Sequence, residues 1–173
     1  ACPFVSLSLD SCWGSKFMNK VISAGVIIFR RTAQGIKYLL LYHGKGYWNF
    51  PKGRLEHAER SIDAAIRETG EETGLQENEL QFQSQFKTFE RFVMKGGGKE
   101  HVFKIVILYL AETQQSEITI SEEHEGFGWF ILTEAKKILT KHPETRVILE
   151  QAHRYILGKQ KRIVLEAEKI NPV

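Results

Sequence analysis

The sequence is poor in cysteine, with only two among 173 residues. Cys2 and Cys12 both precede any segment with the composition of a core. They cannot cross-link that core, which excludes a disulfide-stapled scaffold and favours a reducing compartment. The chain also begins without Met, whereas Met18 precedes the first convincing strand. We therefore expect residues 1–17 to be a leader or a loosely attached extension.

Long apolar runs are also lacking. No run approaches the roughly 18 to 20 residues that span a bilayer, and no basic start followed by an apolar stretch marks a secretory signal. The net charge is only +3, from 24 Lys+Arg against 21 Asp+Glu, which is too little for a surface that coats extended nucleic acid. We expect a cytoplasmic protein with one main domain and no membrane partner, and the sequence leaves its oligomeric state open.

Short β-rich runs begin at residue 22. Their composition predicts strands at residues 22–31, 36–43, 80–89, 101–111 and 127–131. The first two are separated by a tight turn, and "MKGGGKE" at residues 94–100 reads as a hairpin loop.

Helical spacing appears in three segments. Apolar residues recur at steps of three and four in residues 59–73, and Gly74 is placed to end that helix. Residues 134–140 and 144–157 show the same spacing. We place the domain at residues 18–157, and the charged extension at 158–173 either continues the last helix or frays. The order of elements predicts an α+β fold with a mixed sheet between helices.

Three carboxylates crowd into little more than one turn of the first predicted helix. Glu68, Glu71 and Glu72 lie three and four residues apart, so their side chains meet on one side. Each like-charged pair costs about 0.2 to 0.5 kcal/mol, and Gly70 adds a cost of about 1 kcal/mol. A solvated acidic face would account for the acids alone. A hard divalent cation such as Mg²⁺ would convert the repulsion into coordination and bring phosphate chemistry with it.

The residues around these acids resemble a known signature. The segment 53–75 matches the Nudix hydrolase box at its fixed positions, namely Gly53, Glu59, Arg67, Glu68, Glu71, Glu72 and Gly74. Thr69 departs from the larger aliphatic residue that is usual there. The resemblance covers residues 23–157 and implies a Nudix-type α/β/α sandwich with a central mixed sheet and a loop-helix-loop box.

The resemblance also implies roles. The metal ligands would be Glu68, Glu71 and Glu72, aided by a backbone carbonyl near Lys52 or Gly53. The cofactor would be Mg²⁺, with Mn²⁺ as an alternative. The structural members of the box would be Gly53, Glu59 and Arg67, with an ion pair between the last two. Metal-activated water would attack phosphorus, and the base that accepts its proton varies in this superfamily between the box and a later loop.

Two further stretches resemble the asymmetric diadenosine tetraphosphate hydrolases. "YWNFPKGRLE" places Lys52 beside the metal site, where its ammonium group would meet a phosphate. "SEEHEGFGWF" supplies Glu123, a candidate base or auxiliary ligand, and His124, a phosphate donor or a loop-stabilising hydrogen bonder. Trp129 is expected in the core. We assign Glu71, Glu123 and Lys52 to catalysis.

Flat side chains are needed to bind nucleobases. Tyr47 precedes the box, and a rough alignment places Phe92 where related hydrolases stack a Tyr on adenine. Other aromatics nearby, including Phe89, are core or platform candidates. The expected substrate-binding residues are His43, Tyr47, Lys52, Phe92 and His124.

The leading interpretation is an Mg²⁺-dependent hydrolase that splits a dinucleoside tetraphosphate into a nucleoside triphosphate and a monophosphate. The same box fits other substrates, such as an RNA 5′ end, a damaged nucleoside triphosphate, a nucleotide sugar or a diphosphoinositol compound. A Nudix-fold module that binds a nucleotide without turnover is a further alternative, although such a module would be expected to have lost part of the box.

Overall fold

A seven-stranded mixed sheet forms the centre of the protein. The computed structural model describes residues 19–95 and 101–170, so the predicted extension at 1–17 and the middle of the predicted hairpin loop lie outside the described residues. The main path of the sheet runs β3-β2-β1-β6-β5, while β4 pairs with β1 and β7 pairs with β2. The strands are β1 (Asn19–Thr32), β2 (Gly35–Tyr42), β3 (Trp48–Asn49), β4 (Lys52–Arg54), β5 (Gln81–Lys95), β6 (His101–Glu112) and β7 (Gly126–Ile131).

Strand β1 is central because it pairs with three others. It runs parallel to β6 and antiparallel to β2 and β4. Successive side chains of a strand point to opposite faces of the sheet. Val26 and Ile28 join the core on one face, whereas Ile27 and Phe29 join the core on the other. Both faces of the sheet are therefore apolar and need helices to cover them.

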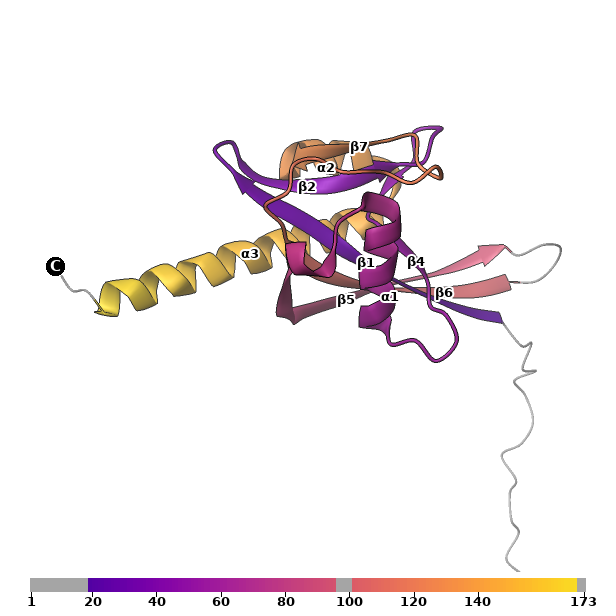
Figure 1. Cartoon of the computed structure of the whole chain (residues 1–173), viewed down its shortest axis with the longest axis horizontal. Coiled ribbons are helices and arrows are strands. Elements are labelled where there is room, and N and C mark those ends of the chain that lie inside the picture. The colour runs from indigo at the N-terminus through magenta and orange to yellow at the C-terminus, as the bar shows by residue number, and fades with distance from the viewer. Residues whose placement is uncertain (1–18, 96–100, 171–173) are drawn as a thin grey trace, which may run out of the picture.

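Helices cover the two faces in the expected way. Helix α1 (Ser61–Thr73) packs on the face of Val26 and Ile28, and α2 (Leu132–Ile138) and α3 (Pro143–Ile170) cover the other face. Figure 1 shows α1 in front of the sheet and α3 running out past it. Short 3₁₀ turns, η1 (Glu77–Glu79) and η2 (Leu139–Lys141), precede β5 and α3. The predicted α+β fold with a mixed sheet between helices is confirmed.

Several boundaries differ from those expected. The strand predicted to end at residue 89 continues to Lys95, and β3 and β4 were not predicted because each spans only two or three residues. Helix α3 continues through the charged segment to Ile170. Gly74 ends α1 as predicted, in the left-handed conformation with φ 73°. No helix in residues 19–95 and 101–170 has both the length and the apolar character needed to cross a membrane.

The buried side of α1 also carries an acid. Ala64 and Ala65 have no exposed surface, so the helix backbone comes close to the sheet. Residues spaced by three or four positions share a helix face, which places Thr69 and Glu72 on the side of Ala65. Both are buried, with Glu72 only 9% exposed. The fold therefore carries one acid of the box into the interior.

A glycine in β1 allows β4 to approach. Gly25 pairs with Lys52 of β4. A Cβ at Gly25 would lie 2.2 Å from the Pro51 carbonyl oxygen and 2.4 Å from Lys52 Cβ. Because these atoms belong to backbone or to a side chain root, they cannot move aside cheaply, and only glycine fits.

Gly25→Ala is expected to lower the free energy of unfolding by about 1 to 3 kcal/mol, since overpacking forces the backbone to shift. Gly158→Ala is the matched control. A Cβ at this position of α3 meets nothing within 4 Å, so this change should stabilise the protein by about 0.5 to 1 kcal/mol. Denaturant titration measures both, and equal stability of Gly25→Ala and the parent protein would contradict the packing described.

Candidate active site

The contact between β4 and α1 brings two box acids to one place. The backbone N–H of Lys52 donates to Glu72 Oε2 at 2.9 Å. The Glu68 carboxylate lies against Gly53, where a Cβ would stand 1.9 Å from Oε2. Gly53 is thus required sterically, because its missing side chain makes the space that Glu68 fills. The two carboxylates, one helical turn apart, face the same strand.

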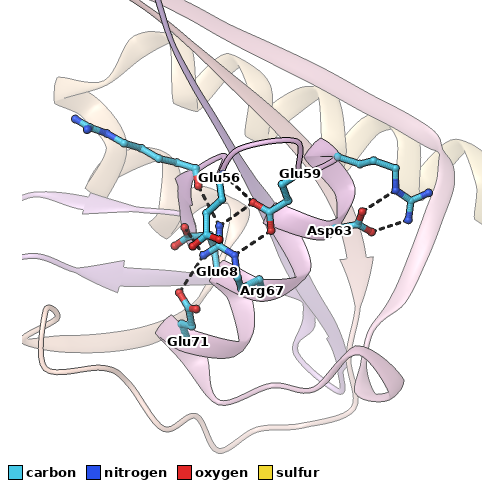
Figure 2. A network of polar contacts seen from close by, with 8 residues as sticks. Glu56, Glu59, Asp63, Arg67, Glu68 and Glu71 are labelled. Carbon is cyan, nitrogen blue, oxygen red and sulfur yellow. Dashed lines mark hydrogen bonds and ion pairs between the residues drawn. The ribbon is translucent and has the colours of Figure 1, made fainter.

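Arg67 binds three acids of the box (Figure 2). Its Nε and Nη2 atoms each donate to Glu59 at 3.0 Å, and its Nη1 atom donates to Glu68 at 2.9 Å and to Glu71 at 3.2 Å. Its Nη2 atom also donates to the Arg54 carbonyl at 3.0 Å. The expected ion pair between Arg67 and Glu59 is present, and it ties the loop before α1 to the helix and to β4.

The three box glutamates differ in environment. Burial raises the pKa of Glu72 to about 7, and burial also raises the pKa of Glu68. Glu71 is instead exposed, with 59% of its side-chain surface accessible. A buried carboxylate with a raised pKa is one whose negative charge is poorly compensated. A nearby divalent cation would compensate it.

The donor set fits a hard cation. All the box donors are oxygens, which Mg²⁺ prefers. Within residues 19–95 and 101–170 no three acidic or histidine groups converge as a complete ligand set, because Arg67 draws Glu68 and Glu71 toward itself. This is compatible with Mg²⁺, which keeps several waters and needs few protein ligands. The ligands would be Glu68 and Glu72, joined by Glu71 once its ion pair with Arg67 is broken.

Two histidines lie beside Glu72. His124 Nε2 is 3.7 Å from Glu72 Oε1, and His124 Nδ1 is 2.9 Å from Ser121 Oγ. The ring centroid of His43 is 4.4 Å from that of His124. Each Nε2 atom is buried and has no hydrogen-bond partner in the part of the chain that the structure describes. Burial, with Lys52 and His124 adding to it, lowers the pKa of His43 to about 4, so its ring is neutral at pH 7.

Lys52 also lines a cavity of about 330 Å³. Its walls combine rings, ammonium groups and carboxylates. The lining residues are Tyr47, Asn49, Lys52, Glu90, Phe92, Lys104, His142, Glu144 and Thr145. The predicted residues Tyr47, Lys52 and Phe92 therefore share one cavity. His43 contacts this group through Tyr47, with ring centroids 5.1 Å apart.

Sequence reasoning missed most of the other lining residues. Lys104 lies directly across the strand pair from Phe92, but this register could not be read before the strand limits were known. Glu90, two residues before Phe92, was detectable as a same-face neighbour. His142 directly precedes α3 and Thr145 lies in its first turn, both far away in the sequence.

The remaining predicted residues lie outside the cavity. Glu123 is exposed on the loop before β7, and its charge raises the pKa of Glu72. Phe89 alternates with the cavity residues of β5; it is 44% exposed, and Lys87 and Arg91 lie over its ring. Trp129 packs against the core, as expected, and donates from Nε1 to the Ser116 carbonyl at 2.8 Å.

Comparison with known proteins decides the family. The NUDIX domain model matches residues 19–152. The chain belongs to the Nudix family. The mouse (Mus musculus) protein named bis(5′-nucleosyl)-tetraphosphatase [asymmetrical] is 32% identical over 144 residues, which cover 78% of this chain and 94% of the relative. A Caenorhabditis elegans protein of the same name is 30% identical and is covered over 98% of its length.

Solved structures agree with this assignment. A C. elegans Ap4A hydrolase, solved as a binary complex, superimposes with a TM-score of 0.69 at 30% identity and covers 80% of this chain and 98% of its own. The chain is thus a Nudix hydrolase similar to the asymmetric diadenosine tetraphosphate hydrolases. Members of this family generally use divalent metal ions, in agreement with the oxygen donors of the Nudix box.

Glu72→Gln is expected to stabilise the metal-free Nudix hydrolase. Burial raises the pKa of Glu72 in the folded protein to about 7, whereas the ordinary pKa of a glutamate is 4.5. Between these values the folded state binds more protons, so the free energy of unfolding falls as pH rises. Above pH 7 the variant should be more stable by on the order of 2 kcal/mol, measured by thermal unfolding in EDTA.

The same variant tests the cation site. Mg²⁺ should raise the Tm of the parent protein and leave the Tm of Glu72→Gln nearly unchanged, because the variant lacks the buried charge. Glu77→Gln, which changes an exposed acid on η1, is the control and should respond like the parent. A variant that is less stable than the parent in EDTA at pH 8 would show that the Glu72 charge is compensated in another way.

Proposed function

We propose that this Nudix hydrolase is Mg²⁺-dependent and cleaves diadenosine tetraphosphate, or a closely related dinucleoside tetraphosphate, into a nucleoside triphosphate and a monophosphate. Similarity to the asymmetric tetraphosphatases over most of their length supports this substrate class. The composition of the site supports it independently, since a bis-nucleotide needs rings for bases, cations for phosphates and carboxylates for metal.

Lys52 is the observation that carries the proposal. Its backbone N–H holds Glu72 at 2.9 Å, and its side chain lines the cavity of Tyr47 and Phe92. One residue therefore joins the carboxylates to the place where a nucleotide would lie. A base stacked on Phe92 or Tyr47 would gain about 1 to 3 kcal/mol, with its phosphate chain directed past the Lys52 ammonium group toward Glu72.

The remaining residues have roles that their positions suggest. The His43 and His124 rings are neutral at pH 7, and their buried Nε2 atoms have no hydrogen-bond partner among the described residues. Each would donate to a phosphate oxygen in the tautomer protonated there. Bound Mg²⁺ would supply a water of lowered pKa and neutralise charge on the phosphates. Glu123, exposed and close enough for its charge to act on Glu72, would accept the proton of the attacking water.

Assay of the full chain against a substrate panel tests the reaction. The panel is diadenosine tetraphosphate, 5′-triphosphate RNA, 8-oxo-dGTP and a diphosphoinositol pentakisphosphate, each with Mg²⁺, with Mn²⁺ and with EDTA. We expect ATP and AMP from the first substrate by anion-exchange chromatography, and no turnover in EDTA. Two molecules of ADP would contradict asymmetric cleavage, and faster turnover of another substrate would replace the proposed one. Binding of nucleotide without turnover of any substrate would indicate a non-catalytic module.

Glu123→Gln and Glu71→Gln separate the base from a metal ligand. Glu123→Gln should lower kcat by about 10²-fold or more, because general-base catalysis contributes at least this much, without changing the Mg²⁺ concentration for half-maximal rate. Glu71→Gln should raise that Mg²⁺ concentration. Steady-state rates over an Mg²⁺ series measure both effects, with Glu77→Gln as the control. If Glu71→Gln lowered kcat and Glu123→Gln raised the Mg²⁺ requirement, Glu71 would be the base and Glu123 the metal ligand.

A further inference from the structure

A buried acid outside the Nudix box lies in the wall of the cavity. Glu90 on β5 is only 8% exposed. Thr145 Oγ1, in the first turn of α3, donates to its Oε1 atom at 2.6 Å. A buried carboxylate is tolerated when hydrogen bonds and opposite charge compensate for its lost hydration. The start of helix α3 carries partial positive charge, and lysine side chains that line the cavity carry full positive charges.

Lys104 is placed to be one of those cations. In the β5–β6 pair Phe92 faces Lys104 and Glu90 faces Val106, so Glu90 is the diagonal neighbour of Lys104. All three side chains, Glu90, Phe92 and Lys104, line the same cavity. Diagonal neighbours on one face are about 7 to 8 Å apart at their Cα atoms, within reach of long side chains. The Lys104 Nζ atom also lies 6.0 Å from the centre of the Phe92 ring.

The groups around Lys104 affect whether its ammonium group stays charged, and Glu90 is the one that favours the charge. Burial lowers the pKa of Lys104, and the positive charges of Lys52 and Arg54 lower it further. Glu90 acts in the opposite direction and favours the charged ammonium group. Without Glu90, Lys104 would stand in a half-buried site beside two other cations, and its flexible side chain would turn toward water.

We propose that Glu90 is a positioning residue: its carboxylate, fixed by Thr145, holds the Lys104 ammonium group in the cavity wall, where that group meets the phosphate chain of the nucleotide. The inference rests on the proposed function, because it takes the cavity to be the nucleotide site. Glu90 itself does not touch phosphate, since two negative groups would repel each other. Glu90 also favours the charged ammonium group of Lys52. The larger part of its effect on the substrate passes through Lys104.

A double-mutant cycle tests this coupling. Glu90→Gln keeps an acceptor for Thr145 and removes only the charge, and Lys104→Met removes the ammonium group. Each single change should lower kcat/KM about tenfold on the nucleotide that the parent cleaves fastest, as expected for one charge-assisted hydrogen bond. In the Lys104→Met background, Glu90→Gln should change kcat/KM less than about twofold, which is the non-additivity of a coupled pair. Additive losses would overturn the proposal.

Thr145→Val distinguishes positioning from a structural tie between β5 and α3. This variant loses the hydrogen bond and keeps the Glu90 charge, so it should lower the Tm more than Glu90→Gln and reduce kcat/KM less. If Glu90→Gln caused no kinetic loss, Glu90 would be structural. A change confined to the preference between diadenosine and diguanosine tetraphosphate would make it a base-reading residue, which also contradicts the proposal.

Calorimetric titration with ATP repeats the cycle without turnover. Glu90→Gln should weaken ATP binding severalfold in the parent background and leave it unchanged in Lys104→Met. The ATP titration therefore tests the Glu90–Lys104 coupling separately from the proposed function. If the parent protein cleaved no substrate of the panel, the proposed function would fail, whereas the ATP cycle would still report whether Glu90 acts through Lys104. Equal weakening in both backgrounds would reject the coupling.

Discussion

The close approach of β4 to its neighbours is the steric constraint on which the site depends. Gly25 on one side and Gly53 on the other leave room that any larger residue would fill. Because neither glycine has a side chain, Lys52 can lie against β1 and the Glu68 carboxylate can lie against β4. The backbone N–H of Lys52 then reaches Glu72. Two missing side chains therefore set the positions of a cation and two acids.

Electrostatics divides the box acids into two kinds. Arg67 donates two hydrogen bonds to Glu59 and one each to Glu68 and Glu71, so its positive charge offsets the repulsion among these acids. Glu72 faces away from Arg67, toward the sheet and His124. Its burial is costly without a cation. Burial raises the pKa of Glu72 most and that of Glu68 as well, which is more typical of a functional site than of a structural ion pair.

Features that depend on residues close together in the sequence could be predicted, whereas features that depend on contacts between distant segments could not. The box residues could be predicted because their spacing along one helix is fixed by the helix itself, and the end of α1 followed from Gly74. The central strands followed from their apolar composition. Lys104 and Thr145 could not be predicted, since strand register and the docking of α3 bring them to the cavity. The rough alignment already singles out Phe92, and the alternation of β5 places Phe92 in the cavity wall and Phe89 on the other face.

The parallel pairing of β1 with β6 has a consequence for folding. It joins Asn19 to Val102 and Phe29 to Glu112, so the box lies inside a long loop that this pairing closes. Loop closure and parallel pairing of distant segments are slow steps. The carboxylate cluster can begin to form locally from β4 and α1, but the cavity wall of β5 and β6 arrives only with that closure. A nascent chain that has not yet made β6 therefore holds the sequence signature of the enzyme without the cavity that Lys52 and Phe92 line.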